Sequence, residues 1–278
     1  MTSPLASTAS FDEIFGAWQS AADDFLALVT PLSQEEWDAP TALPGWSIGD
    51  IVAHVSWIEG IMLGEVDPPH EPDWAALPHV RNDFGRITEI PVDLRRAWPR
   101  EQVLIELADV VSRRGAALRE GPHDVNVEVF GPLGLAPLGR VVQMRAMDTW
   151  VHEQDIRDAL GRPGHRDTPG AQATAAQLLP GLPKVWVKGA GAQPGQVLRL
   201  VVTGPELTAE RWVAVGEDGR GRTGESGANP TTTLTMDWST YLALACGRGD
   251  QDVLRARVEV EGDHSLGQRT LEAFTVMI

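Results

Sequence analysis

The chain has 278 residues, 42% of them hydrophobic and 22% charged, so it is long enough for two globular domains with a sizeable core. Its formal net charge of −16 opposes association with a polyanion, and we expect no nucleic-acid partner. The first ten residues lack the features of a secretory signal, no apolar run approaches the roughly 18 residues that cross a bilayer, and Cys246 is the single cysteine. We therefore expect a cytoplasmic protein without membrane contact.

Amphipathic helices dominate the first 160 residues. Apolar residues recur at helical spacing over 10–31, and a second helix is predicted from the N-cap Ser47 to about Leu63. Asp50, three residues after Ser47, completes a capping box with aspartate in the usual place of glutamate. Two further helices are predicted over 99–120 and 138–160. Four long amphipathic helices are typical of an up-and-down bundle.

Two long segments separate these helices. Residues 65–98 are rich in Pro and His, and we expect loops and short helices there that border a functional site. Residues 121–137 contain several Gly and Pro and are predicted to be a connector. The histidines without a partner at a regular spacing are expected on the surface or in loops: His70, His79, His123, His165 and His264.

The pattern changes after about residue 165. A helix is predicted over 170–183, and short β-branched or alternating runs then predict strands, which are 197–203, 211–215, 231–236 and 254–260. Helical patterns at 238–246 and 264–274 are interleaved with them. The sequence thus predicts an N-terminal domain over 1–165 and a smaller α+β domain over 166–278.

The fourth helix carries ionisable residues on one stripe. At about 100° per residue, Asp148, His152 and Asp155 project from one side of the helix together with apolar residues. That stripe should face the bundle interior, where a carboxylate is costly unless it is paired or binds a metal. Asp148 and His152 stand one turn apart, which brings two potential ligands to one side of the helix.

The second helix offers a third ligand. His54 lies at the edge of that helix's apolar face, from which it can point toward the fourth helix. Two imidazoles and a carboxylate make a three-ligand site for a divalent metal with positions left for water or substrate. The spacing alone also suits a simple Asp148–His152 salt bridge beside a core histidine. Asp155 is expected to accept a hydrogen bond from a ligand histidine.

Two stretches resemble the signature segments of the mycothiol-dependent maleylpyruvate isomerase family, in the DinB-like metal-binding superfamily. They are PGWSIGDIVAH at 44–54 and DTWVHEQDIRDALG at 148–161. The resemblance implies a four-helix bundle whose His54, Asp148 and His152 bind a metal, with zinc expected, followed by a sterol-carrier-like α+β domain. The acid of the family pattern is glutamate, and Asp148 is one methylene shorter. The stretch LACGRGD at 244–250 also resembles the family, which implies an active-site role for Arg248 in binding substrate or thiol.

The resemblance implies a metal- and thiol-dependent transferase or isomerase that uses mycothiol and acts on a small electrophile. A metal bound at the open site would deprotonate the thiol, so no catalytic cysteine is needed. Two alternatives stay open: a metal-dependent hydrolase of the same superfamily, and a non-catalytic metal- or small-molecule-binding protein. We expect a monomer or a small homo-oligomer.

Overall fold

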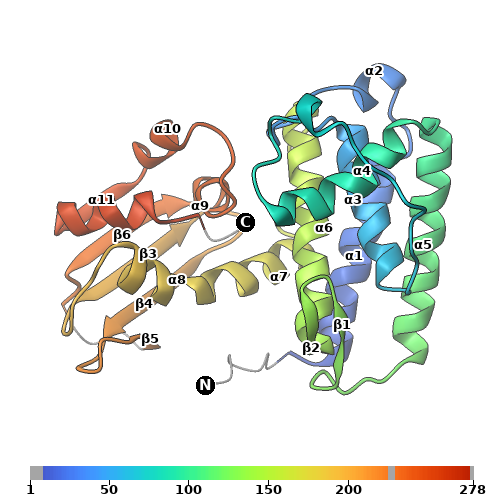
Figure 1. Ribbon diagram of the computed structural model, residues 1–278. Helices are drawn as coiled ribbons and strands as arrows, with labels where there is room; N and C mark the ends of the chain where they lie inside the picture. Colours follow the sequence, from blue (N-terminus) through green and yellow to red (C-terminus); the bar gives the residue numbers. More distant parts are fainter. Residues whose placement is uncertain (1–8, 225–228, 276–278) are drawn as a thin grey trace. The chain divides into compact units, whose positions relative to one another are not determined.

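The computed structural model describes residues 9–224 and 229–275, and the chain divides into two compact units (Figure 1). The units are Met1–Thr174 and Ala175–Ile278, and helix α7 (Pro169–Leu178) runs across the division. The first unit is helical and the second contains a sheet, which confirms the predicted fold class. The domain boundary at residue 165 stays a prediction. In the described part of the chain, every helix is too short or too polar to span a membrane.

The first unit contains the four predicted long helices. They are α1 (Phe11–Val29), α3 (Ile48–Ile61), α5 (Arg100–Glu120) and α6 (Leu138–Leu160). Helix α6 packs along α1, α5 packs along α3, and α3 also contacts α6. The short α2 (Gln34–Trp37) precedes α3. This packing brings the middle of α3 beside the middle of α6, the two segments that carry the predicted ligands.

Local signals in the sequence fix the ends of α3 and α6. Ser47 accepts a hydrogen bond from the backbone N–H of Asp50, whose carboxylate accepts one from the backbone N–H of Ser47. The predicted capping box is therefore confirmed. Helix α6 ends at Gly161, which has a φ of 63° that a glycine adopts without strain.

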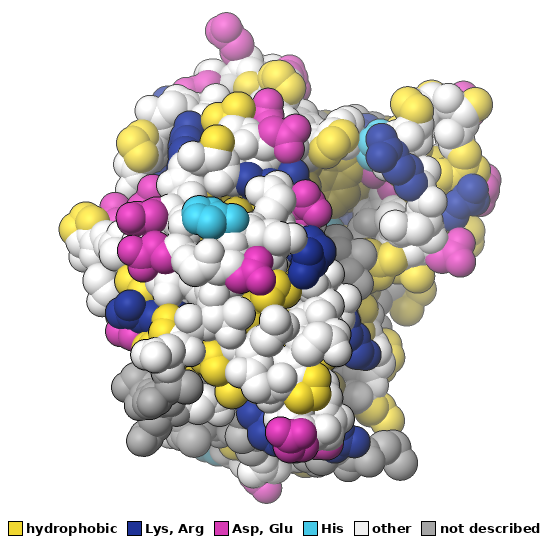
Figure 2. Space-filling model, turned by 90° about the vertical axis from the view of Figure 1, so that its left-hand side faces the viewer, with side chains coloured by type: hydrophobic (Ala, Val, Ile, Leu, Met, Phe, Trp, Pro, Cys, Tyr) yellow, Lys and Arg dark blue, Asp and Glu magenta, His cyan; other side chains and the backbone are white. Residues whose placement is uncertain are grey.

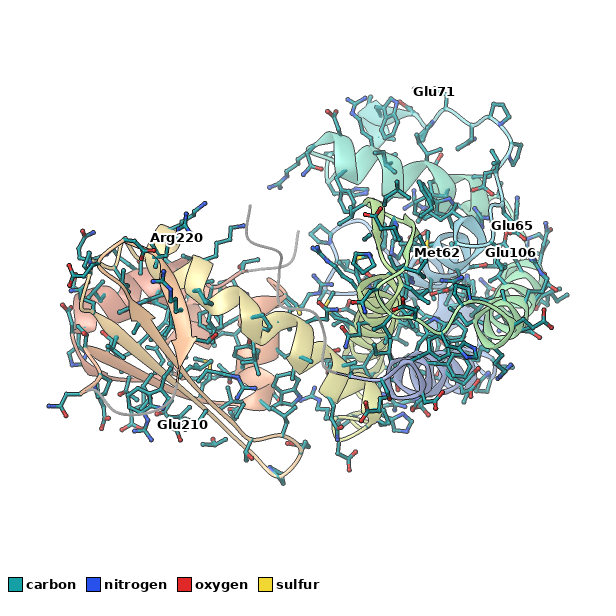
Figure 3. The ribbon with its side chains drawn as sticks, turned by 90° about the horizontal axis from the view of Figure 1, so that it is seen from below. Met62, Glu65, Glu71, Glu106, Glu210 and Arg220 are labelled. Carbon is teal, nitrogen blue, oxygen red and sulfur yellow. The ribbon has the colours of Figure 1, made fainter. Side chains whose placement is uncertain are left out.

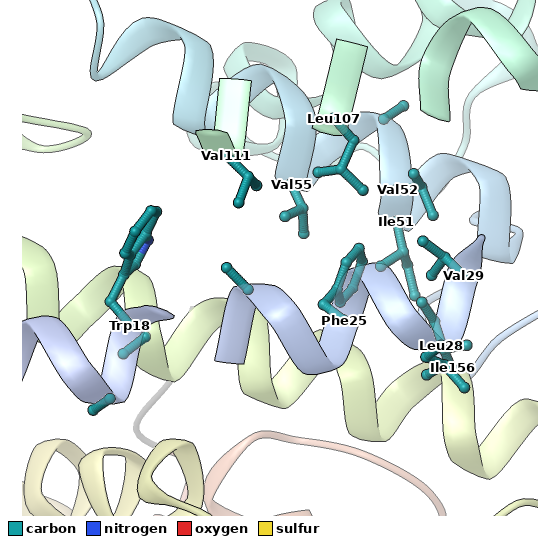
Figure 4. Packing of buried hydrophobic residues seen from close by; sticks show 14 of the residues in the cluster. Trp18, Phe25, Leu28, Val29, Ile51, Val52, Val55, Leu107, Val111 and Ile156 are labelled. Carbon is teal, nitrogen blue, oxygen red and sulfur yellow. The ribbon is translucent and has the colours of Figure 1, made fainter. Parts of the chain in front are cut away.

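The core of the first unit is formed by apolar residues from all four long helices (Figure 4). The labelled members are Trp18, Phe25, Leu28, Val29, Ile51, Val52, Val55, Leu107, Val111 and Ile156. Because each helix contributes an apolar stripe to this one cluster, burial of these stripes sets the rotation of α3 and α6 about their axes.

The two connecting segments contain more regular secondary structure than the sequence predicts. Residues 65–98 contain the 3-10 turn η1 (Trp74–Ala76) and the 14-residue helix α4 (Asp83–Arg96), which packs against α3. The expectation of loops and short helices was therefore wrong for α4. Strands β1 (Glu128–Gly131) and β2 (Gly134–Pro137) form an antiparallel hairpin within the predicted connector.

The second unit is a five-stranded sheet with helices packed on it. The strand order is β5-β4-β3-β6-β7, in which only the central pair β3–β6 is parallel among the described residues. The strands are β3 (Val197–Thr203), β4 (Ala209–Val215), β5 (Gly221–Gly224), β6 (Thr232–Asp237) and β7 (Glu259–Gly262). The helices are α8 (Leu182–Lys184), α9 (Trp238–Ala245), α10 (Gln251–Arg255) and α11 (His264–Glu272), with the turns η2 (Leu179–Gly181) and η3 (Val185–Gly189).

The predicted strands agree with β3, β4 and β6, whereas β5 was not predicted and the last strand begins later than expected. Leu254 belongs to α10, so the strand expected over 254–260 begins only at Glu259. Helix α11 approaches β7 closely at Gly267, where an added Cβ would lie 2.5 Å from Val260 Cγ1. Figure 2 shows one face of the molecule, on which acidic, basic and hydrophobic side chains are interspersed.

Candidate metal centre

The first unit brings the three predicted ligands together. His54 comes from α3, and Asp148 and His152 come from consecutive turns of α6. One ligand atom of each lies within 4.8 Å of the others. The distance from His54 Nε2 to Asp148 Oδ2 is 3.5 Å, and that from His152 Nε2 to Asp148 Oδ1 is 3.8 Å.

These two distances bear on what the group can bind. An N–H···O hydrogen bond has its heavy atoms about 2.7–3.2 Å apart, so both contacts are longer than an ordinary one. Two ligand atoms on one tetrahedral zinc, at bond lengths of about 2.0–2.1 Å, lie about 3.4 Å apart. Each spacing is compatible with two atoms that share an ion, and the two nitrogens approach different oxygens of Asp148.

His54 has the properties of a ligand imidazole. Its relative exposure is only 5%, and its Nδ1 is a buried atom without a hydrogen-bond partner among the described residues. Burial lowers the pKa of His54 below its ordinary value, against the opposing influence of Asp148. The ring is therefore neutral at pH 7, which is the state that binds a metal.

Arg145 keeps the carboxylate of Asp148 charged. Its Nη1 donates a hydrogen bond of 2.7 Å to Asp148 Oδ2 from one turn earlier in α6. Burial acts to raise the pKa of Asp148, but Arg145 and the two imidazoles outweigh it and hold that pKa well below its usual range. A buried anion is thus available to a metal at neutral pH.

Glu59 of α3 completes the ion pairing in the interior. Its Oε1 accepts hydrogen bonds from Arg145 Nε at 2.9 Å and from Trp18 Nε1 at 3.3 Å, and Arg114 Nε lies 3.9 Å from its Oε2. Glu59 and Arg145 are each 1% exposed. The sequence reasoning missed both residues, although the spacing of Arg145 three residues before Asp148 is a signal for a helical ion pair.

Asp155 lies where the sequence analysis expects it. Its Oδ2 is 3.1 Å from His152 Nδ1, and both side chains are buried. In the tautomer with the proton on Nδ1, His152 donates this hydrogen bond to Asp155, and Nε2 faces Asp148 with a lone pair. The role of Asp155 as a support for a ligand stays a prediction.

Two tryptophans flank the imidazoles. The Trp46 ring centre lies 5.3 Å from that of His54 and 6.4 Å from that of His152, and Trp57 lies 6.1 Å from His54. The two imidazoles meet edge to face at 5.1 Å. Aromatic walls of this kind exclude water and strengthen electrostatic interactions within the site.

Three of the histidines expected on the surface or in loops have carboxylate partners. His70 Nε2 lies 2.7 Å from Asp93, and His79 Nε2 lies 3.0 Å from Glu89. His165 Nδ1 lies 2.9 Å from Glu153, in a second cluster with Asp24. Their sequence separations follow no helical spacing, so these pairs could not be read from the sequence.

The second unit contains Arg248. It follows α9 in a turn between two glycines of positive φ, and its Nη1 donates a hydrogen bond of 2.8 Å to the carbonyl oxygen of Cys246. The side chain is partly buried. Its role toward a substrate or thiol stays a prediction.

A family model matches half of the chain. Residues 18–157 match the family model described as the mycothiol maleylpyruvate isomerase N-terminal domain. An uncharacterized protein of Mycobacterium tuberculosis is 30% identical over 145 residues, which are 51% of this chain and 54% of that protein. The chain therefore spans about half the length of the curated relatives it matches.

Solved structures show the fold. A crystal structure of the mycothiol-dependent maleylpyruvate isomerase aligns with a TM-score of 0.55 at 16% identity, covering 87% of this chain and 90% of that one. A histidine-to-alanine mutant of that enzyme aligns with a TM-score of 0.56 at 16% identity, covering 91% and 93%. The residues that match the family model include His54, Asp148 and His152, and cover half of the chain. The chain belongs to the family of the mycothiol maleylpyruvate isomerase N-terminal domain.

Proposed function

We propose that this protein is a metal- and thiol-dependent transferase or isomerase that acts on a small electrophile. His54, Asp148 and His152 would hold one divalent ion, with zinc the ion proposed from the donor set of two imidazoles and a carboxylate. The observation that carries the proposal is the spacing of 3.5 and 3.8 Å between the imidazole nitrogens and the carboxylate oxygens.

Residues around the site set the protonation states that binding of a metal and a thiol requires. A bound divalent ion lowers the pKa of a coordinating thiol or water, so that the nucleophile forms near neutral pH. His54 is held neutral by burial and Asp148 is held charged by Arg145. Glu59 balances the guanidinium of Arg145, so this charge stays fixed in place in the interior.

Mycothiol is the thiol that the family name supports. An external thiol also agrees with the state of the protein's own cysteine, because Cys246 is 3% exposed and lies in the second unit. We propose that Arg248 binds a carboxylate of the electrophile or of the thiol, since a guanidinium forms two parallel hydrogen bonds with that group.

The test is turnover by purified, metal-loaded protein. We expect consumption of maleylpyruvate or of a general electrophile such as chlorodinitrobenzene that depends on mycothiol and is lost in His54→Ala. His165→Ala, in the second cluster, is the matched control and should keep the activity. Absence of thiol-dependent turnover with every electrophile tested, while the metal is bound, would contradict the proposal.

The same experiment separates the alternatives. A hydrolase of the superfamily would turn over ester or amide substrates without any thiol, because water then supplies the nucleophile. A carrier would retain its ligand at a fixed stoichiometry and release it unchanged. Either result would replace the transferase or isomerase assignment.

A further inference from the structure

We infer that Glu89 is a positioning residue that holds the Trp46 indole against the two histidines of the candidate centre. Through this contact, helix α4 sets how a thiol approaches the centre. The geometric part of the inference depends on the structure alone, and the effect on thiol binding rests on the proposed function.

Trp46 is the link between the centre and the rest of the first unit. Its backbone is fixed, because its carbonyl oxygen accepts a hydrogen bond of 2.9 Å from Thr41 Oγ1 and the next residue, Ser47, caps α3. Its ring packs near both His54 and His152. With the backbone fixed, the side-chain torsion angles of Trp46 still have to be set, and a hydrogen bond from the indole Nε1 sets them.

Glu89 provides that contact from α4. Its Oε2 accepts a hydrogen bond of 2.8 Å from Trp46 Nε1 and lies 3.0 Å from His79 Nε2, and its Oε1 accepts one of 2.7 Å from Arg96 Nη1. Glu89 is only 1% exposed. A carboxylate buried to this degree with partners on both oxygens has a fixed orientation, so its hold on the indole is directional.

The same network fastens α4 to the start of α3. Arg96 Nε donates a hydrogen bond of 2.8 Å to Asp50 Oδ1, while Asp50 Oδ2 caps α3. His79 packs on the turn before α3 so closely that a Cβ added to Gly45 would lie 2.3 Å from its Nδ1. Gly45 also has a φ of 79°. Arg95 of α4 also donates a hydrogen bond of 2.7 Å to Glu106 of α5, which is labelled in Figure 3. The segment at 65–98 is therefore joined to both α3 and α5.

The position of this network predicts what its loss would change. Glu89 has no hydrogen bond to His54, Asp148 or His152 among the described contacts, so metal affinity should be little affected by its removal. The indole, once released, would sample other rotamers beside the imidazoles and obstruct or expose the approach of a thiol. The expected effect is on thiol binding, separate from metal binding.

The experiment compares Glu89→Ala with Asp93→Ala. Asp93 lies on the same helix and also binds Arg96 and a histidine, but among the described residues the hydrogen bond of the Trp46 indole goes to Glu89. The first readout is the indole N–H resonance of Trp46 in the protein, assigned with Trp46→Phe. We expect this resonance to shift and its hydrogen exchange to accelerate in Glu89→Ala, and to stay unchanged in Asp93→Ala.

The second readout uses protein loaded with Co²⁺ and titrated with 2-mercaptoethanol, followed by the sulfur-to-cobalt absorption. In Glu89→Ala we expect thiol binding to weaken by roughly two- to tenfold, the range for loss of one hydrogen bond. Cobalt affinity should change by less than about threefold. Glu89→Gln keeps an acceptor for the indole, so its thiol affinity should lie between those of Glu89→Ala and the wild type. This variant replaces Glu89→Ala in the comparison if Glu89→Ala fails to fold.

Equal indole resonances in Glu89→Ala and Asp93→Ala would overturn the positioning role. Equal thiol affinities in the two variants would overturn its effect on the centre. A wild-type protein that binds Co²⁺ but shows no thiol absorption would contradict the proposed function and the thiol clause of this inference, while the resonance measurement would still decide whether Glu89 positions Trp46.

Discussion

The first unit contains two clusters of histidine and carboxylate that differ in how closely the imidazoles are paired. In the candidate centre, both imidazole nitrogens stand 3.5 and 3.8 Å from the oxygens of Asp148. In the second cluster, His165 Nδ1 lies 2.9 Å from Glu153 Oε1, which also accepts a hydrogen bond of 2.7 Å from Arg157 Nε. The first imidazoles are held apart from their carboxylate, and the second is already paired.

This difference shows that a short distance between histidine and carboxylate side chains is weak evidence for a metal site. Both clusters have three ligand atoms within 4.8 Å of one another. Only the first offers two buried imidazoles. The second also has one long contact, 3.7 Å from His165 Nδ1 to Asp24 Oδ1, so spacing alone does not separate the clusters. His165 has an exposed side chain, at 41%, and an ion there would have to displace its bond to Glu153. We therefore propose a metal for the first cluster and an ion pair for the second.

The largest expected effect concerns the arginine of each cluster. Arg145→Met removes the nearest cation from the buried carboxylates of Glu59 and Asp148 and leaves Arg114 at 3.9 Å from Glu59, and we expect the free energy of unfolding to fall by about 3–5 kcal/mol. Arg157→Met in the second cluster should cost less, because Arg157 pairs with Glu153 from a more exposed position and His165 remains. Urea unfolding of the metal-free proteins measures both. Equal losses would contradict the distinction between the clusters.

Much of the fold could be predicted because its signals are local. The helical periodicity and the capping box at Ser47 predict α3, and Gly161 predicts the end of α6. Helix α4 was missed because Pro91 lies inside it, and a proline normally interrupts a helix. The hairpin β1–β2 was missed because its glycines and prolines are equally typical of a connector.

The candidate site shows the same division between local and distant signals. Asp148, His152 and Asp155 share one face of one helix, so their proximity follows from spacing alone. The partnership of Arg145 with Glu59 joins residues 86 positions apart, and no periodicity reports it. The contact of Glu89 with Trp46 depends likewise on the packing of α4 against α3.

The next largest effect concerns Asp155, the carboxylate that contacts the ligand His152. Asp155→Asn removes the anionic partner of His152 Nδ1, and we expect metal affinity to fall by roughly 10–100-fold, as for other partners of ligand histidines. Asp24→Asn, which changes the carboxylate beside His165, should leave metal affinity unchanged. Competition with a chromophoric chelator measures both. An unchanged affinity in Asp155→Asn would contradict the proposed support.

A smaller effect is expected from the second cluster itself. His165→Gln removes one hydrogen bond to Glu153 while Arg157 remains, so the free energy of unfolding should fall by about 1 kcal/mol. Thermal unfolding of metal-free protein measures this change. A loss of several kcal/mol, or a loss of bound metal, would show that the second cluster is more than an ion pair.

The smallest effect is a pH dependence. Burial lowers the pKa of His54 in the folded protein, so the unfolded chain binds its proton more readily. His54 therefore contributes stability that is present above the unfolded pKa of about 6.5 and is lost as pH falls through the lowered folded value. Urea unfolding of the metal-free protein between pH 7.5 and 5 should show a steeper decline in the wild type than in His54→Gln. Parallel declines would contradict the prediction.

The most direct test of the metal centre is the metal content of four purified proteins after loading with zinc and removal of the excess. We expect about one ion per chain in the wild type and in His165→Ala, and less than about 0.1 in His54→Ala and His152→Ala, since each of these loses one of three protein ligands. Equal zinc in all four proteins, or none in the wild type, would contradict the assignment of His54, Asp148 and His152 as a metal site.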